Sequence, residues 1–169
     1  MAKQTLSSLD LAKEMIALDA AALTEVDIAQ LQRLIMDYSA VTLCGSVQPW
    51  GYKMRVWAQE QKSNGPCRLI GSGELANAAT AALANGTAAH GYELDDTHEA
   101  SSSHPGAVVI TAALAVAAEC GSNGRDILAA VAAGYEAMAR IGRAAISQQV
   151  TERGFHATCL FGPFGAATA

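Results

Sequence analysis

The chain has 169 residues, with 11 lysines and arginines against 16 aspartates and glutamates, which gives a formal net charge of −5. This acidic balance excludes a broad basic surface for a phosphate backbone, so no nucleic-acid partner is expected. Hydrophobic residues make up 51% of the sequence and aromatic residues only 5%, so alanine supplies much of the apolar content and predicts an all-α, Ala-rich helical domain over residues 1–169.

The first half of the chain predicts helices separated by short turns. Apolar residues repeat at helical spacing over residues 9–18. Thr24 and Asp27 form a capping pattern that begins a second helix, expected to end near Leu43 before a break at residues 44–46. Beyond it we expect a helix over residues 50–61 with Trp50, Met54 and Trp57 in the core, a short extended segment over residues 67–71, and an Ala-rich helix over residues 74–90.

Two further helices are expected over residues 106–120 and 124–146, with Gly121 ending the first. A Gly-containing bend follows, and the residues from Phe161 onward have the composition of another Ala-rich helix, although Gly162–Gly165 is equally interpretable as a turn. No stop signal follows that helix, so we expect the chain to be the N-terminal part of something longer.

No apolar run is long enough to span a membrane, and no signal peptide is visible, so a cytoplasmic protein is expected. The cysteines are widely separated and predict reduced thiols, most of them buried as small hydrophobic residues. Burial is also expected for Cys159, with a nucleophilic role as the alternative. The four cysteines are Cys44, Cys67, Cys120 and Cys159.

The densest polar cluster lies between His90 and Pro105. If the helix continued through Thr97, then Glu93 and Thr97 would share one face, with His90 and Asp96 nearby. A carboxylate, a hydroxyl and an imidazole would then converge and could bind a hydroxy-polycarboxylate and move a proton beside one of its carboxyl groups. The cation that this chemistry needs is not visible in the cluster.

Other interpretations of the polar residues stay open. The cluster could be a solvated acidic turn in which Asp95 or Asp96 caps the next helix. His156, beside Phe155, could be a structural residue. A metal site is a further alternative, but the spacing of its potential ligands matches no strong signature, so no metal is predicted. Those ligands would be His90, Asp95, Asp96, His98 and His104.

Three motifs together carry a resemblance to a known family: residues 85–98 (NGTAAHGYELDDTH), residues 103–106 (SHPG) and residues 154–158 (GFHAT). With these motifs the chain resembles the MmgE/PrpD family, which includes 2-methylcitrate dehydratase, cis-aconitate decarboxylase and an iminodisuccinate epimerase. The resemblance implies a helical domain, a smaller α+β domain elsewhere in the chain, an active site between them, and a homodimer. It also implies cofactor-free chemistry at a carbon beside a carboxylate.

By this resemblance, Thr97, His104 and His156 fall on positions that line the pocket of the decarboxylase. Glu93 falls where the decarboxylase has an aspartate, which leaves the substrate open. We therefore predict catalytic roles for His104, His156, Glu93 and Thr97, and substrate binding by Asp95, Asp96 and Thr158. The family's pocket lysines and tyrosine fall outside these 169 residues.

Two classes of function follow as hypotheses. The first is the N-terminal lobe of a lyase acting on a small tricarboxylate or related acid, of the 2-methylcitrate dehydratase (propionate metabolism) or cis-aconitate decarboxylase type, inactive alone; an epimerase of the same family is a variant of it. The second is a non-catalytic helical protein that associates with itself or a partner, because an Ala-rich sequence can leave an apolar helix face uncovered.

Overall fold

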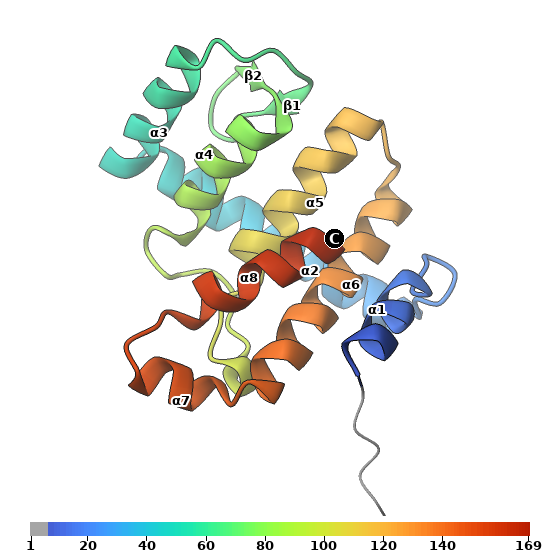
Figure 1. The fold of residues 1–169 in the computed structure, drawn as a ribbon. Coiled ribbons are helices and arrows are strands. Elements are labelled where there is room, and N and C mark those ends of the chain that lie inside the picture. Colours follow the sequence, from blue (N-terminus) through green and yellow to red (C-terminus); the bar gives the residue numbers. More distant parts are fainter. Residues whose placement is uncertain (1–6) are drawn as a thin grey trace, which may run out of the picture.

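The computed structural model describes residues 7–169 and confirms the all-α prediction (Figure 1). The described helices are α1 (Ser8–Ile16), α2 (Glu25–Ser46), α3 (Pro49–Glu60), α4 (Ala78–His90), α5 (Gly106–Cys120), α6 (Gly124–Ala144), α7 (Ser147–Glu152) and α8 (Ala157–Thr168). Strands β1 (Cys67–Arg68) and β2 (Leu75–Ala76) form a small antiparallel sheet, with Cys67 opposite Ala76.

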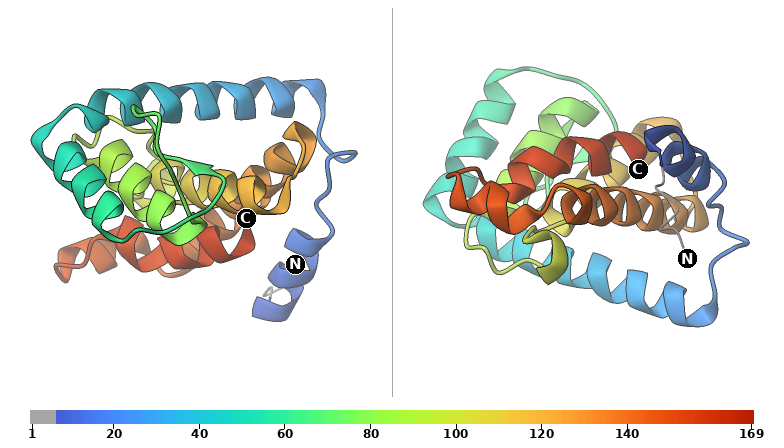
Figure 2. Two further views of the ribbon diagram at one scale, coloured as in Figure 1. Left: turned by 90° about the horizontal axis from the view of Figure 1, so that it is seen from above. Right: turned by 60° about the horizontal axis from the view of Figure 1, so that its bottom comes forward.

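Helix α5 lies at the centre of the packing. In Figure 2 (left), α2 runs along one side, α4 and α5 lie beneath it, and α8 lies on the opposite side. Val109 and Ile110 of α5 face in different directions, and both are fully buried because another helix covers each of them. Ile110 packs with Tyr38 of α2, and Val109 packs with Phe161 of α8. A helix that is apolar all round is expected at such a central position.

Helix α2 continues through the residues that were expected to end it. Gly45 is helical and buried, and a Cβ atom placed on it would lie 1.9 Å from the carbonyl oxygen of Ala88 in α4. The predicted break at residues 44–46 is therefore wrong. The glycine serves the close contact between α2 and α4 instead of a turn, and the helix ends only at Ser46.

Other predicted boundaries also move. Helix α4 begins at Ala78 rather than Glu74, because Leu75 and Ala76 pair with β1 and Asn77 caps the helix. Helix α6 ends at Ala144, and α7 was not predicted. The interpretation of residues 162–165 as a turn is wrong, since they lie inside α8. Two predictions for α5 are confirmed: the helix ends at Cys120, and Gly121 caps it in the left-handed conformation.

The cysteine predictions hold only in part. All four thiols are free, but Cys67 alone is buried, so the expectation that most of them are buried is wrong. Cys159, in the first turn of α8, is exposed, so its expected burial is wrong. The tryptophans and Met54 are partly buried rather than fully inside the core.

Across residues 7–169, no helix combines the length and apolar character that a membrane crossing demands.

Candidate active site

The polar segment after α4 is a loop. The helix ends at His90, and Glu93 adopts a left-handed backbone conformation with φ of 51°. The expectation that Glu93 and Thr97 share a helix face is therefore wrong, because the chain leaves the helix before either residue. The loop instead returns Asp95 to a position beneath His90, where the two side chains are in contact.

Asp95 lies between two imidazoles. Its side chain is 1% exposed, and both carboxylate oxygens lie 3.1 Å from His90 Nδ1. One of these oxygens also lies 3.5 Å from His104 Nδ1, and the ring centroids of His90 and His104 are 5.1 Å apart. One buried carboxylate thus holds histidines from the end of α4 and from the segment before α5.

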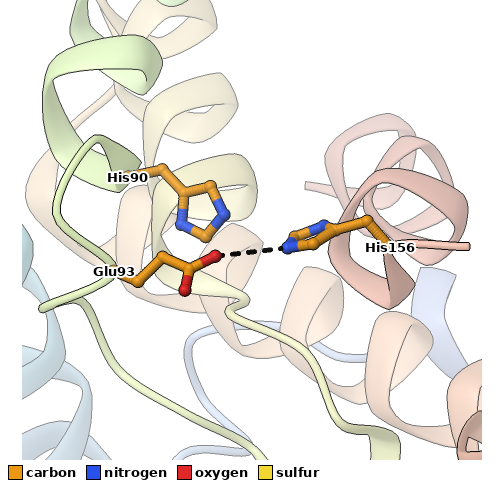
Figure 3. Close-up of side chains that lie close together, drawn as sticks. All are labelled: His90, Glu93 and His156. Atoms are coloured by element: carbon orange, nitrogen blue, oxygen red, sulfur yellow. Dashed lines mark ion pairs between the residues drawn. The ribbon is translucent and has the colours of Figure 1, made fainter. Parts of the chain in front are cut away.

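A third histidine reaches the same place from the far end of the chain. His156 precedes α8, and its ring centroid lies 5.4 Å from that of His90 (Figure 3). Its Nε2 atom lies 3.5 Å from Glu93 Oε1, and its Nδ1 atom accepts a hydrogen bond from the backbone N–H of Cys159. Both Glu93 and His156 are exposed, so this side of the cluster is open to a ligand.

Backbone contacts hold the segments of the site together. The buried Thr158 hydroxyl accepts a hydrogen bond from the backbone N–H of His104 at 2.9 Å, which joins α8 to the segment before α5. Asp96 faces the other way: its oxygens accept hydrogen bonds from the backbone N–H of Gly106 and the hydroxyl of Tyr135. Asp96 therefore caps α5, as one of the alternative interpretations expected. Thr97 is exposed on the loop.

The charges around the cluster favour a cationic imidazole. The hydrogen bond that His90 donates to Asp95 is the main cause that raises the pKa of His90 above its usual value, and the negative charges of Asp95 and Glu93 add to this against the opposing effect of burial. The pKa of Asp96 is also raised, first by burial, while its hydrogen bonds from Tyr135 and Gly106 oppose the shift. His90 is thus a candidate for the cation that was not visible in the sequence.

A groove of about 560 Å³ leads away from the histidines between α4, α5 and α8. His90 and Thr158 stand at its lining, and the remainder is made largely of small apolar side chains. These include Ala82, Leu83, Ala107, Val108, Ala112 and Ala166.

Two sets of side chains among the described residues bring three possible metal ligands within 4.8 Å of one another. One is His90, Glu93 and His156, and the other is His90, Asp95 and His104. In both sets, imidazole nitrogens already face carboxylate oxygens at hydrogen-bond or ion-pair distance. Pairing between histidine and carboxylate accounts for these contacts, and we assign no chemistry to a metal here.

Comparison with known proteins places this chain in a family. The MmgE/PrpD N-terminal domain matches residues 9–169. The chain belongs to the MmgE/PrpD family. The cis-aconitate decarboxylase-like protein oryM of Aspergillus oryzae is 31% identical over 150 residues, which cover 84% of this chain and 31% of that protein. The cis-aconitate decarboxylase of Aspergillus terreus is 32% identical over 139 residues, which cover 79% of this chain and 28% of that enzyme. The chain thus spans less than a third of the length of these relatives.

For this MmgE/PrpD chain, the structure brings together most of the predicted site residues and adds His90. Glu93 and His156 face each other, and His104 contacts both Asp95 and Thr158. Among the hydrogen bonds and ion pairs of the described residues, none joins Asp96 or Thr97 to the three histidines. His90 was noted only as a neighbour or a metal ligand in the sequence. Its spacing of five residues from Asp95 would have indicated the pairing only if the loop after α4 had been foreseen.

Proposed function

We propose that this chain is the histidine-bearing lobe of an MmgE/PrpD lyase that acts on a small tricarboxylate or related acid. The observation that supports the proposal is the convergence of His90, His104 and His156, from three separate segments, around the carboxylates of Asp95 and Glu93. Imidazoles bind carboxylates when protonated and transfer protons near neutral pH, so one cluster serves both tasks.

The substrate class follows from this chemistry and from the relatives. A polyanion would be held by the cationic imidazole and would accept a hydrogen bond from His156. For loss of water, a base removes a proton from the carbon next to a carboxyl group, and the hydroxyl leaves with a proton as water. For loss of carbon dioxide, the broken carbon–carbon bond leaves its electron pair on the substrate, and that carbon takes a proton. We assign the proton transfers to His104 and His156.

The remaining parts of the proposal concern the whole protein. We propose that residues outside this chain complete the site and that the 169-residue chain alone does not turn over substrate, because a polycarboxylate carries more negative charge than the described cluster can balance. We also propose a cytoplasmic homodimer. Glu93 and Thr97 would position the substrate, and the reaction would need no cofactor.

The test is turnover by the protein expressed from its complete reading frame, with 2-methylcitrate and cis-aconitate as substrates. We expect turnover of one of them, and a fall in kcat on the order of 10²-fold or more for His104→Ala and for His156→Ala. His98→Asn is the matched control, because His98 bonds Ser101 rather than the cluster. If neither acid is turned over, or if both alanine variants keep the wild-type kcat, the proposal is wrong.

A second candidate function rests on the apolar groove between α4, α5 and α8. Leu83 stands on its rim with 51% of its surface exposed, and small apolar side chains line most of the rest. Such a surface favours burial against another protein surface. A non-catalytic role in self-association or partner binding would use this groove and neither His104 nor His156, so the alanine variants above would leave it unaffected.

A further inference from the structure

Hydrogen-bond chemistry fixes which nitrogen carries the proton in each histidine of the site. The partners of His104 Nδ1 are a carboxylate oxygen of Asp95 at 3.5 Å and the backbone carbonyl oxygen of Asp95 at 3.4 Å. Both are acceptors only, so His104 Nδ1 must be the donor and carry the proton. His90 Nδ1 faces the same carboxylate at 3.1 Å and is a donor for the same reason.

His156 has the opposite arrangement. Its Nδ1 atom receives the backbone N–H of Cys159 in the first turn of α8, so this nitrogen must be unprotonated. The ring proton then resides on Nε2, which faces the acceptor Glu93 Oε1 at 3.5 Å.

We propose that Asp95 is a positioning residue that keeps His104 in the Nδ1–H tautomer, so that His104 Nε2 is the proton acceptor of the site while His156 Nε2–H is its hydrogen-bond donor to substrate. The inference rests on the proposed function and divides the proton-transfer roles that the sequence left open. It also replaces the expected contact between Asp95 and substrate, because a side chain that is 1% exposed acts on substrate through the rings that it holds.

The burial of Asp95 makes this control effective. A buried carboxylate that pairs with an imidazole fixes both the tautomer and the orientation of the ring, as carboxylates do for histidines in other catalytic and metal sites. One carboxylate here serves two rings, so removing its charge alters His90 and His104 together. The adjacent Asp96 does not share this role, since its oxygens are bonded to Gly106 and Tyr135.

The ring states can be measured without reference to activity. In the protein expressed from its complete reading frame and labelled with ¹⁵N-histidine, two-bond ¹H–¹⁵N spectra at alkaline pH distinguish the tautomers of neutral rings. We expect the Nδ1–H form for His90 and His104 and the Nε2–H form for His156. Finding His104 as Nε2–H, or His156 as Nδ1–H, in the wild-type protein overturns the proposal.

The functional arm uses Asp95→Asn, whose carboxamide can donate to Nδ1 and so release the Nδ1–H tautomer. We expect His104 to shift toward Nε2–H and kcat to fall on the order of 10²–10⁴-fold, with KM changed far less. Asp126→Asn, an equal change at the start of α6, is the control and should alter neither readout. Asp95→Glu, which keeps an acceptor-only group, should recover part of kcat.

The two arms separate the possible failures. Wild-type kcat in Asp95→Asn overturns the positioning role even if the tautomers are as assigned. If the wild-type protein has the assigned tautomers but turns over neither acid, the proposed function is wrong and only the assignment of the ring states is supported.

Discussion

Asp95 and Asp96 are adjacent in the sequence but serve different parts of the molecule. Asp95 faces His90 and His104, whereas Asp96 joins the start of α5 to Tyr135 of α6. The motif alone placed both acids at the substrate. The directions in which two adjacent side chains face cannot be predicted until the path of the loop is known. The same limit concealed His90, whose partner Asp95 becomes adjacent only through the turn after α4.

The pairing of His90 with Asp95 predicts a pH-dependent stability. The pKa of His90 is raised in the folded protein, so its contribution is complete below the usual value of 6.5 and is lost as pH rises through the raised folded-state value. The difference in unfolding free energy between wild type and Asp95→Asn should therefore shrink as pH rises from 6.5 through the raised pKa of His90 in the folded protein.

This prediction is checked by urea unfolding of both proteins at several pH values. Asp126→Asn provides the control, because Asp126 caps α6 without a histidine partner and its cost should stay constant over this window. A free-energy difference for Asp95→Asn that does not change with pH would contradict the assigned pairing.

At the scale of elements, local patterns predicted the helices well and their boundaries less well. The capping pair Thr24 and Asp27 and the left-handed Gly121 are local signals, and both are confirmed. The boundaries that failed depend on partners far away in the sequence: β2 exists because it pairs with β1, and α2 continues through Gly45 because α4 packs there.

The contact at Gly45 predicts a specific cost. In Gly45→Ala, the added methyl group would meet the backbone of Ala88 and force α2 and α4 apart, so we expect a loss of about 1–3 kcal/mol in unfolding free energy. Gly73→Ala is the matched control, since a Cβ atom there has no neighbour within 4 Å, and its effect should stay within about 0.5 kcal/mol. Equal effects of the two changes in urea unfolding would show that the close approach does not constrain the helices.

At the scale of the whole molecule, the all-α fold followed from composition and helical periodicity, whereas the site required the assembly of three distant segments. His104 and His156 are separated by three helices in the sequence, and the packing of α5 against α8 brings them together. Family resemblance identified these histidines, but their partners and tautomers depend on the assembled structure.

The proposed self-association is tested at this scale as well. We expect the chain to show a concentration-dependent rise in molar mass by light scattering, and Leu83→Glu to reduce it by placing a charge on the groove. Ile16→Glu, at an exposed position on α1 outside the groove, should leave the mass unchanged. A monomer at every concentration would contradict the use of the groove as an association surface.

The central claim, that the three histidines form a polycarboxylate site, is tested most directly by adding tricarballylate to the ¹⁵N-histidine-labelled protein expressed from its complete reading frame. This tricarboxylate has neither the hydroxyl group nor the double bond of the proposed substrates and serves as an unreactive probe. The account predicts saturable changes in the ring signals of His90, His104 and His156, with little change at His98. Signals that do not respond, or a response confined to His98, would contradict it.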